Sequence, residues 1–137
     1  METIRFPGRY ESLPKVGEFV IRAARKAGLS EKEIYAVELA VDEACSNIIV
    51  HAYGGEDVGE MECTVGVDQN GLKIILRDTG RPFNPKKIPK PSFNVPIEDL
   101  KPRGVGFYLM QKMMDEIHYE HSDDDGNTLT LVKRKKE

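Results

Sequence analysis

The sequence VDEACSNIIVHAY at residues 41–53 forms the second half of a helix that we expect to begin just after Ser30. Ser30 is a favourable N-cap residue, and Glu33 three positions later completes a capping box. Apolar residues recur along the segment at helical spacing, so one face of this helix should lie in the hydrophobic core. The apolar residues are Ile34, Val37, Val41, Ala44, Cys45, Ile48 and Ala52.

Glu43 and Asn47 are four residues apart, so they share one face of this helix, and it is not the main apolar face. Apolar positions lie on either side of the pair, which should therefore face a second, partly apolar environment rather than open water. A carboxylate and a carboxamide in such a place need polar partners. The helix alone leaves two interpretations open: a structural polar pair, or a general base beside a metal ligand.

The composition bounds the classes of protein to consider. A chain of 137 residues can bury a proper core, and we expect residues 1–137 to form one domain. A net charge of −3 argues against direct binding to nucleic acid. The sequence shows no targeting signal and no apolar run near 18 residues, so we expect a cytoplasmic protein without membrane contact. Cys45 and Cys63 form neither a disulfide framework nor a zinc site.

The order of the remaining elements is typical of helices packed on an antiparallel sheet. A helix capped by Ser12 and ended by Gly28 should precede the helix described above, and Asn70-Gly71 should form a hairpin turn. In the last strand, Leu129 and Leu131 alternate inward. We therefore predict an α+β fold, a two-layer sandwich of about three helices on one mixed, mostly antiparallel sheet. Its strands should lie near residues 3–6, 60–67, 72–77, 116–121 and 128–133, and its third helix should begin at residue 104.

A long segment separates the third strand from the third helix. Residues 84 to 103 hold five prolines and four lysines and show little periodicity. Loops of this length inside a compact domain usually serve as lids or binding loops, or are disordered. We interpret residues 84–103 as a lid.

Two further motifs could bind a ligand. Gly104-x-Gly106 stands at a helix start, where free backbone N–H groups and the helix dipole attract an anion such as phosphate. Asp78 stands at a strand end, where its carboxylate can accept a hydrogen bond from an exocyclic amino group, and Gly80 would let a flat ring come close. Simple structural explanations, a flexible helix start and an Asx turn, remain open for each motif. Gly126-Asn127-Thr128 is a turn that leads into a strand.

Taken together and in order, these motifs resemble the nucleotide-binding boxes of the histidine-kinase-like ATPase superfamily. Glu43-x-x-x-Asn47 with the following His51-Ala52-Tyr53-Gly54 resembles the first box, and Asp78-x-Gly80-x-Pro82-Phe83 resembles the second. Arg103-Gly104-Val105-Gly106-Phe107-x-Leu109 resembles the glycine box, and Gly126-x-Thr128 the last. The resemblance covers roughly residues 10 to 132 and implies the histidine-kinase-like ATPase fold with an ATP lid at about 84–103.

Within this superfamily the chain most resembles the bacterial anti-sigma-factor serine/threonine kinases. The Pro82-Phe83 pair differs from the glycine and aliphatic residue that are usual in sensor histidine kinases, and residues 113–117 resemble the run after the glycine box in the anti-sigma-factor kinases. The resemblance implies an enzyme that uses ATP and Mg²⁺, phosphorylates an anti-sigma-factor antagonist and sequesters a sigma factor. It also implies a possible homodimer.

The resemblance also implies a role for individual residues. Asp78 would bind the adenine amino group with support from Thr128 through water, and Asn47 would hold Mg²⁺. Glu43 would act as the general base on a serine or threonine hydroxyl, and His51 would lie near the metal or the phosphates. The phosphates themselves would be bound by Arg103, Gly104, Val105 and Gly106.

Two other functions remain compatible with these motifs. The chain could be a nucleotide-gated module that switches partners without kinase activity. It could also be a stand-alone ATPase domain of the sensor-kinase type.

Overall fold

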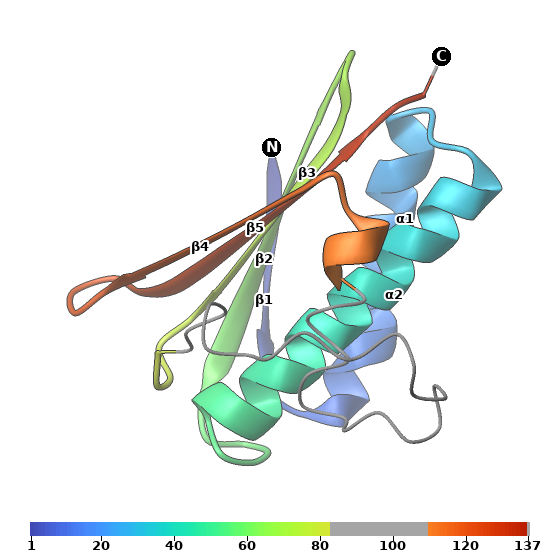
Figure 1. Cartoon of the computed structure of the whole chain (residues 1–137). Helices are drawn as coiled ribbons and strands as arrows, with labels where there is room; N and C mark the ends of the chain where they lie inside the picture. Colours follow the sequence, from blue (N-terminus) through green and yellow to red (C-terminus); the bar gives the residue numbers. More distant parts are fainter. Residues whose placement is uncertain (83–109, 137) are drawn as a thin grey trace, which may run out of the picture.

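A five-stranded sheet forms one layer of the described structure, and two long helices, α1 (Leu13–Lys26) and α2 (Glu31–Asn47), cover one of its faces (Figure 1). The computed structural model describes residues 1–82 and 110–136. The strand order is β1-β2-β3-β5-β4, and all four pairings between the described strands are antiparallel. The predicted α+β sandwich is thereby confirmed. The strands are β1 (Glu2–Pro7), β2 (Glu60–Asp68), β3 (Gly71–Asp78), β4 (Glu116–Ser122) and β5 (Gly126–Arg134).

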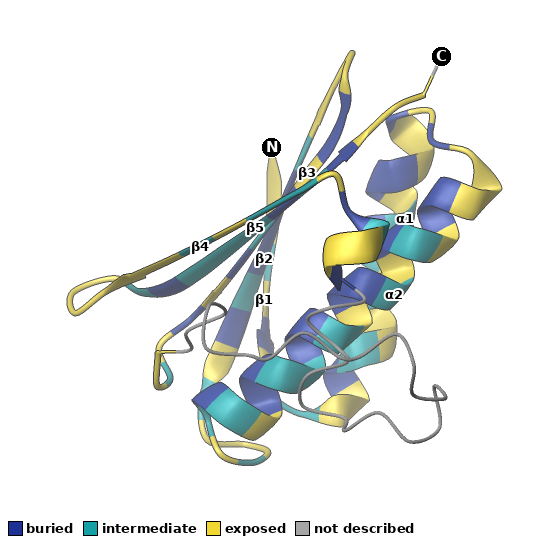
Figure 2. Cartoon of the chain, in the orientation of Figure 1, coloured by how far each residue is buried: buried dark blue, intermediate teal, exposed yellow. Residues whose placement is uncertain are grey.

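Helix α2 begins as its sequence predicts. The Ser30 hydroxyl accepts a hydrogen bond from the Glu33 backbone N–H at 3.2 Å, and the Glu33 carboxylate accepts one from the Ser30 N–H at 2.8 Å. All seven apolar residues of the predicted stripe are buried, so this face packs on the sheet. Figure 2 shows buried residues along both helices and the middle of the sheet.

The last turn of this long helix is not α-helical. Residues Ile48–Ala52 form the π-helical segment η2, in which the Tyr53 N–H donates to the Ile48 carbonyl at 2.9 Å, five residues back. Such wide turns are rare and often occur at functional sites. Gly54 and Gly55, both with positive φ, then end the segment.

The start of α1 differs from the prediction that Ser12 caps this helix. A 3₁₀ turn, η1 (Tyr10–Ser12), precedes α1, and the Ser12 hydroxyl donates to the Pro7 carbonyl at 2.8 Å instead of capping the helix. Ser12 therefore ties the helix layer to the end of β1. Gly28 ends α1 with a φ of +79°, as predicted.

Alternate residues of the central strands supply the sheet's share of the core. Met61, Cys63 and Val65 on β2 are buried, as are Leu72, Ile74 and Leu76 on β3. The turn between these strands is the predicted Asn-Gly hairpin, with the Asp68 carboxylate accepting from the N–H groups of Asn70 and Gly71.

Residues 110–113 are helical and follow the segment outside the described residues. The predicted start of this helix at Gly104 and the predicted lid at 84–103 both lie in that segment. Within the described part of the chain, no helix is long and apolar enough to cross a membrane.

Candidate functional site

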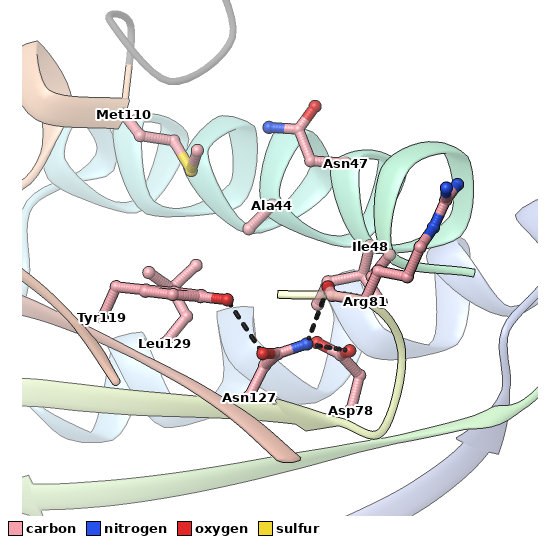
Figure 3. Close-up of a pocket in the computed structure, with 10 residues that line it drawn as sticks. Ala44, Asn47, Ile48, Asp78, Arg81, Met110, Tyr119, Asn127 and Leu129 are labelled. Carbon is pink, nitrogen blue, oxygen red and sulfur yellow. Dashed lines mark hydrogen bonds between the residues drawn. The ribbon is translucent and has the colours of Figure 1, made fainter. Parts of the chain in front are cut away.

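A pocket lies between the end of the helix layer and the end of β3 (Figure 3). Asn47 on α2 stands on one side of it, and Asp78 on β3 and Asn127 on β5 stand on the other. Because the walls come from both layers, residues far apart in sequence meet here. The lining residues are Ala44, Asn47, Ile48, Ala52, Asp78, Arg81, Met110, Tyr119, Asn127 and Leu129.

The Asp78 carboxylate is the most buried charged group of this pocket, with 6% of the residue exposed. Its Oδ1 accepts hydrogen bonds from the Gly80 N–H at 2.9 Å and from the Asn127 side chain at 2.8 Å. Burial raises the pKa of Asp78, while Asn127, the Gly80 N–H and His121 act in the opposite direction. No described residue donates a hydrogen bond to Oδ2, so this oxygen can accept one from a ligand.

Asn127 is the centre of the polar network around Asp78. It is 3% exposed, and the two hydrogens of its Nδ2 are shared among three acceptors: Asp78 Oδ1 at 2.8 Å and the carbonyls of Gly80 and Arg81, both at 3.1 Å. Its Oδ1 accepts from Tyr119 Oη and from His121 Nδ1, each at 2.8 Å. The network therefore holds the turn after β3 against β5.

The structure places Asn127, and not the predicted Thr128, beside Asp78. The register pairs Asn127 with Asp78 and Thr128 with Arg77. Successive strand residues face opposite sides of a sheet, so Thr128 lies on the outer face, away from the pocket. Leu129 and Leu131 were predicted to face inward. The residue two positions before Leu129 in the same alternation is Asn127. This was the signal in the sequence that could have identified it.

The structure shows a packing role for Gly80 that the sequence analysis did not predict. A Cβ at this position would lie 2.5 Å from the Ala52 carbonyl oxygen, and the next N–H, that of Arg81, donates to the same oxygen at 2.8 Å. Gly80 thus allows the turn after β3 to pack directly on η2. The predicted approach of a ligand ring to Gly80 stays a prediction.

The predicted pair on α2 faces this region in part. Asn47 lines the pocket, whereas Glu43, one helical turn earlier, is half-buried and is not a lining residue. Burial, together with the neighbouring Asp42, raises the pKa of Glu43. Neither the Glu43 nor the Asn47 side chain makes a hydrogen bond to another described residue, and both interpretations of the pair stay predictions. His51 is half-buried on η2, and its predicted role stays a prediction.

Four predicted phosphate-binding residues, Arg103, Gly104, Val105 and Gly106, lie outside the described residues. Within the described ranges, no group of three or more histidine, cysteine, aspartate or glutamate residues could hold a metal ion.

The sequence profile of the histidine kinase-like ATPase domain matches residues 6–133. The chain belongs to this family. Curated relatives include the serine-protein kinase RsbW of Bacillus thuringiensis (strain Al Hakam) and that of Bacillus anthracis (strain A0248). Each is 31% identical over 134 residues, which cover 95% of this chain and 82% of the relative. The family resemblance noted in the sequence is confirmed.

A solved structure shares the histidine kinase-like ATPase fold. It contains the RsbU and RsbW domains of Rv1364c from Mycobacterium tuberculosis, and it matches with a TM-score of 0.62 and 15% sequence identity. The match covers 100% of this chain and 34% of that chain. At this identity the likeness concerns the fold alone.

Proposed function

We propose that this chain is an ATP- and Mg²⁺-dependent protein serine/threonine kinase that acts as an anti-sigma factor. It would phosphorylate an anti-sigma-factor antagonist and sequester a sigma factor in the cytoplasm. The observation that carries the proposal is that Asn47 and Asp78, from different layers, line one pocket in a chain of the histidine kinase-like ATPase family. The similarity to RsbW, named a serine-protein kinase, supports this choice within the family.

The residues of the pocket fit the base of ATP. The Asp78 carboxylate offers Oδ2 as an acceptor for the adenine amino group, since its described hydrogen bonds all end at Oδ1. Ile48 and Leu129 supply apolar surface for a flat ring, because they line the same pocket from opposite layers. The glycine box at 103–106 would bind the phosphates, as the family resemblance implies.

The residues also fit Mg²⁺. Asn47 supplies a carboxamide oxygen, and magnesium typically takes one or two protein oxygens and completes its shell with phosphates and water. When bound, Mg²⁺ would neutralise charge on the phosphates. His51 would lie near this end of the nucleotide.

Glu43 is the candidate general base. Its raised pKa makes it a stronger base than an exposed glutamate, and it lies one turn from Asn47. In the transfer, the substrate hydroxyl oxygen bonds to the γ-phosphorus while the bond from that phosphorus to the β–γ bridging oxygen breaks. The hydroxyl proton passes to Glu43.

The test combines the purified chain with Mg²⁺, γ-labelled ATP and the cognate antagonist. We expect acid-stable phosphoserine or phosphothreonine on the antagonist. Glu43→Gln should slow transfer by about 100-fold or more, with ATP affinity within about threefold of wild type. Glu38→Gln, on the exposed side of the same helix, is the matched control and should transfer normally. ATP binding without any transfer would reject the kinase function.

One observation favours a second function, a nucleotide-gated partner switch without catalysis. Glu43 is not among the residues that line the pocket, whereas Asn47 and Asp78, two of the residues proposed to bind the nucleotide, are. Partner regulation in cells that survives Glu43→Gln intact would support the switch. Transfer to histidine, recognised by acid-labile phosphate on the partner, would indicate a stand-alone sensor-kinase-type domain instead. Light scattering on the purified chain would test the predicted homodimer.

A further inference from the structure

The amide of Asn127 can take only one orientation in its surroundings. On one side it meets three acceptors, Asp78 Oδ1 and the carbonyls of Gly80 and Arg81. On the other it meets the hydroxyl of Tyr119 and Nδ1 of His121. A flipped amide would turn its oxygen toward three acceptors, and each buried polar group left unpaired costs stability. Tyr119 and His121 therefore hold the NH₂ group toward Asp78. Figure 3 shows Asn127 between Tyr119 and Asp78.

This arrangement treats the two carboxylate oxygens of Asp78 differently. Oδ1 is held by Asn127 and the Gly80 N–H, at 2.8 and 2.9 Å, whereas no described residue donates to Oδ2. A carboxylate fixed by one oxygen presents the other in a constant direction. Since an ionised carboxylate is an acceptor only, Oδ2 attracts an amino group and repels a carbonyl oxygen.

We propose that Asn127 is a positioning residue that makes the pocket select 6-aminopurine nucleotides over purines with hydrogen or a carbonyl at that carbon. Asn127 acts through Asp78 and does not itself touch the base. Tyr119 sets the orientation of the Asn127 amide. This inference rests on the proposed binding of ATP.

Loss of the Asn127 amide would weaken selection in two ways. Of its two hydrogen bonds to described residues, the Asp78 side chain would keep the one from the Gly80 N–H, and it could rotate, so Oδ2 would lose its fixed direction. Burial, which raises the pKa of Asp78, would also be less opposed, and a protonated carboxyl can donate to a carbonyl oxygen. Both effects reduce the difference between amino and carbonyl purines.

The measurement is calorimetric titration of the whole chain with ADP, inosine diphosphate and the purine riboside diphosphate that lacks the 6-amino group. We expect the wild type to bind ADP about tenfold or more tightly than the other two. Asn127→Ala should bring these ratios below about threefold. Thr128→Ala is the matched control, because the adjacent residue faces away from the pocket, and should leave them unchanged.

The ratio separates positioning from a purely structural role. A smaller folded fraction would weaken all three nucleotides equally and leave their ratio intact. Tyr119→Phe, which removes one hydroxyl, provides a second variant if Asn127→Ala does not fold, and should lower the ratio at least about threefold. The inference would be overturned, with ATP binding left in place, if the affinity ratio of ADP to the other two nucleotides were unchanged in both variants. If Asn127→Ala does not fold, an unchanged ratio in Tyr119→Phe alone would overturn it. A wild type that binds none of the nucleotides would overturn both, and one that binds all three equally would overturn this inference.

Discussion

Replacing Gly80 with alanine would place a methyl group against the backbone of η2. The added Cβ would lie 2.5, 2.6 and 2.7 Å from three atoms of Ala52, two of which are main-chain atoms. The Ala52 carbonyl belongs to the π-helical segment η2 and accepts a hydrogen bond from the Arg81 N–H. The η2 backbone therefore cannot move away without breaking that bond. The turn after β3 must therefore shift away from the helix layer.

The size of the effect follows from these contacts. Overpacking of a tight site costs about 1–3 kcal/mol, and loss of the Arg81–Ala52 hydrogen bond costs about 0.5–1.5 kcal/mol. We expect Gly80→Ala to lower the free energy of unfolding by about 2–4 kcal/mol. For a domain of this length the unfolding entropy is about 0.3 kcal/mol/K, so the Tm should fall by about 7–14 °C.

The matched control is the same substitution on α1. A Cβ on Gly17 meets no atom of a described residue within 4 Å, and glycine inside a helix is less favourable than alanine. Gly17→Ala should therefore raise the stability by up to about 1 kcal/mol. Circular dichroism melts and urea titrations measure both variants. Equal stability of Gly80→Ala and wild type, or comparable losses in the two variants, would refute the explanation from close backbone contact.

Three further predictions concern buried or capping groups. Because burial raises the pKa of Asp78, ionisation of this carboxyl lowers the stability of the folded chain at neutral pH. Asp78→Asn should therefore be more stable than wild type at neutral pH. Urea titrations should show that this advantage disappears as the pH falls below 3.8, the ordinary pKa of an aspartate. Burial raises the pKa of Cys63 to about 12 and that of Cys45 well above its ordinary value, so mass spectrometry should find both thiols unlabelled by iodoacetamide until the chain unfolds. Native labelling at the rate of a free thiol would contradict this. Ser30→Ala should lower the free energy of unfolding by about 1 kcal/mol, whereas Ser46→Ala on the same helix should stay within about 0.5 kcal/mol; equal losses in urea would dismiss the capping box.

Much of the fold was predictable because hydrophobic periodicity reports directly on burial. The stripe on α2 and the alternation on β2 and β3 both mark the faces that meet in the core. The capping box and the Asn-Gly turn were predictable because a few neighbouring residues form them entirely. The role of Ser12 was not, since its hydroxyl bonds the Pro7 carbonyl at the end of a strand whose position depends on tertiary packing.

The candidate site was predictable only in part, for the same reason. Asn47 and Asp78 stand at the ends of elements, where spacing and motif order locate them. Asn127 emerges from strand register, which pairs it with Asp78 across 49 residues of sequence. The role of Gly80 depends on a π-helical turn, and helical periodicity alone does not predict the five-residue hydrogen bonds of that turn.

The pocket joins the two layers of the domain, with Asn47 on the helix side and Asp78 on the sheet side. A small molecule bound there would contact both layers, and its binding free energy would add to the free energy of unfolding. At a concentration 100 times its dissociation constant, such a ligand contributes about 2.7 kcal/mol. The supply of that ligand in a living cell would then help to set how long each copy of the protein escapes proteolysis.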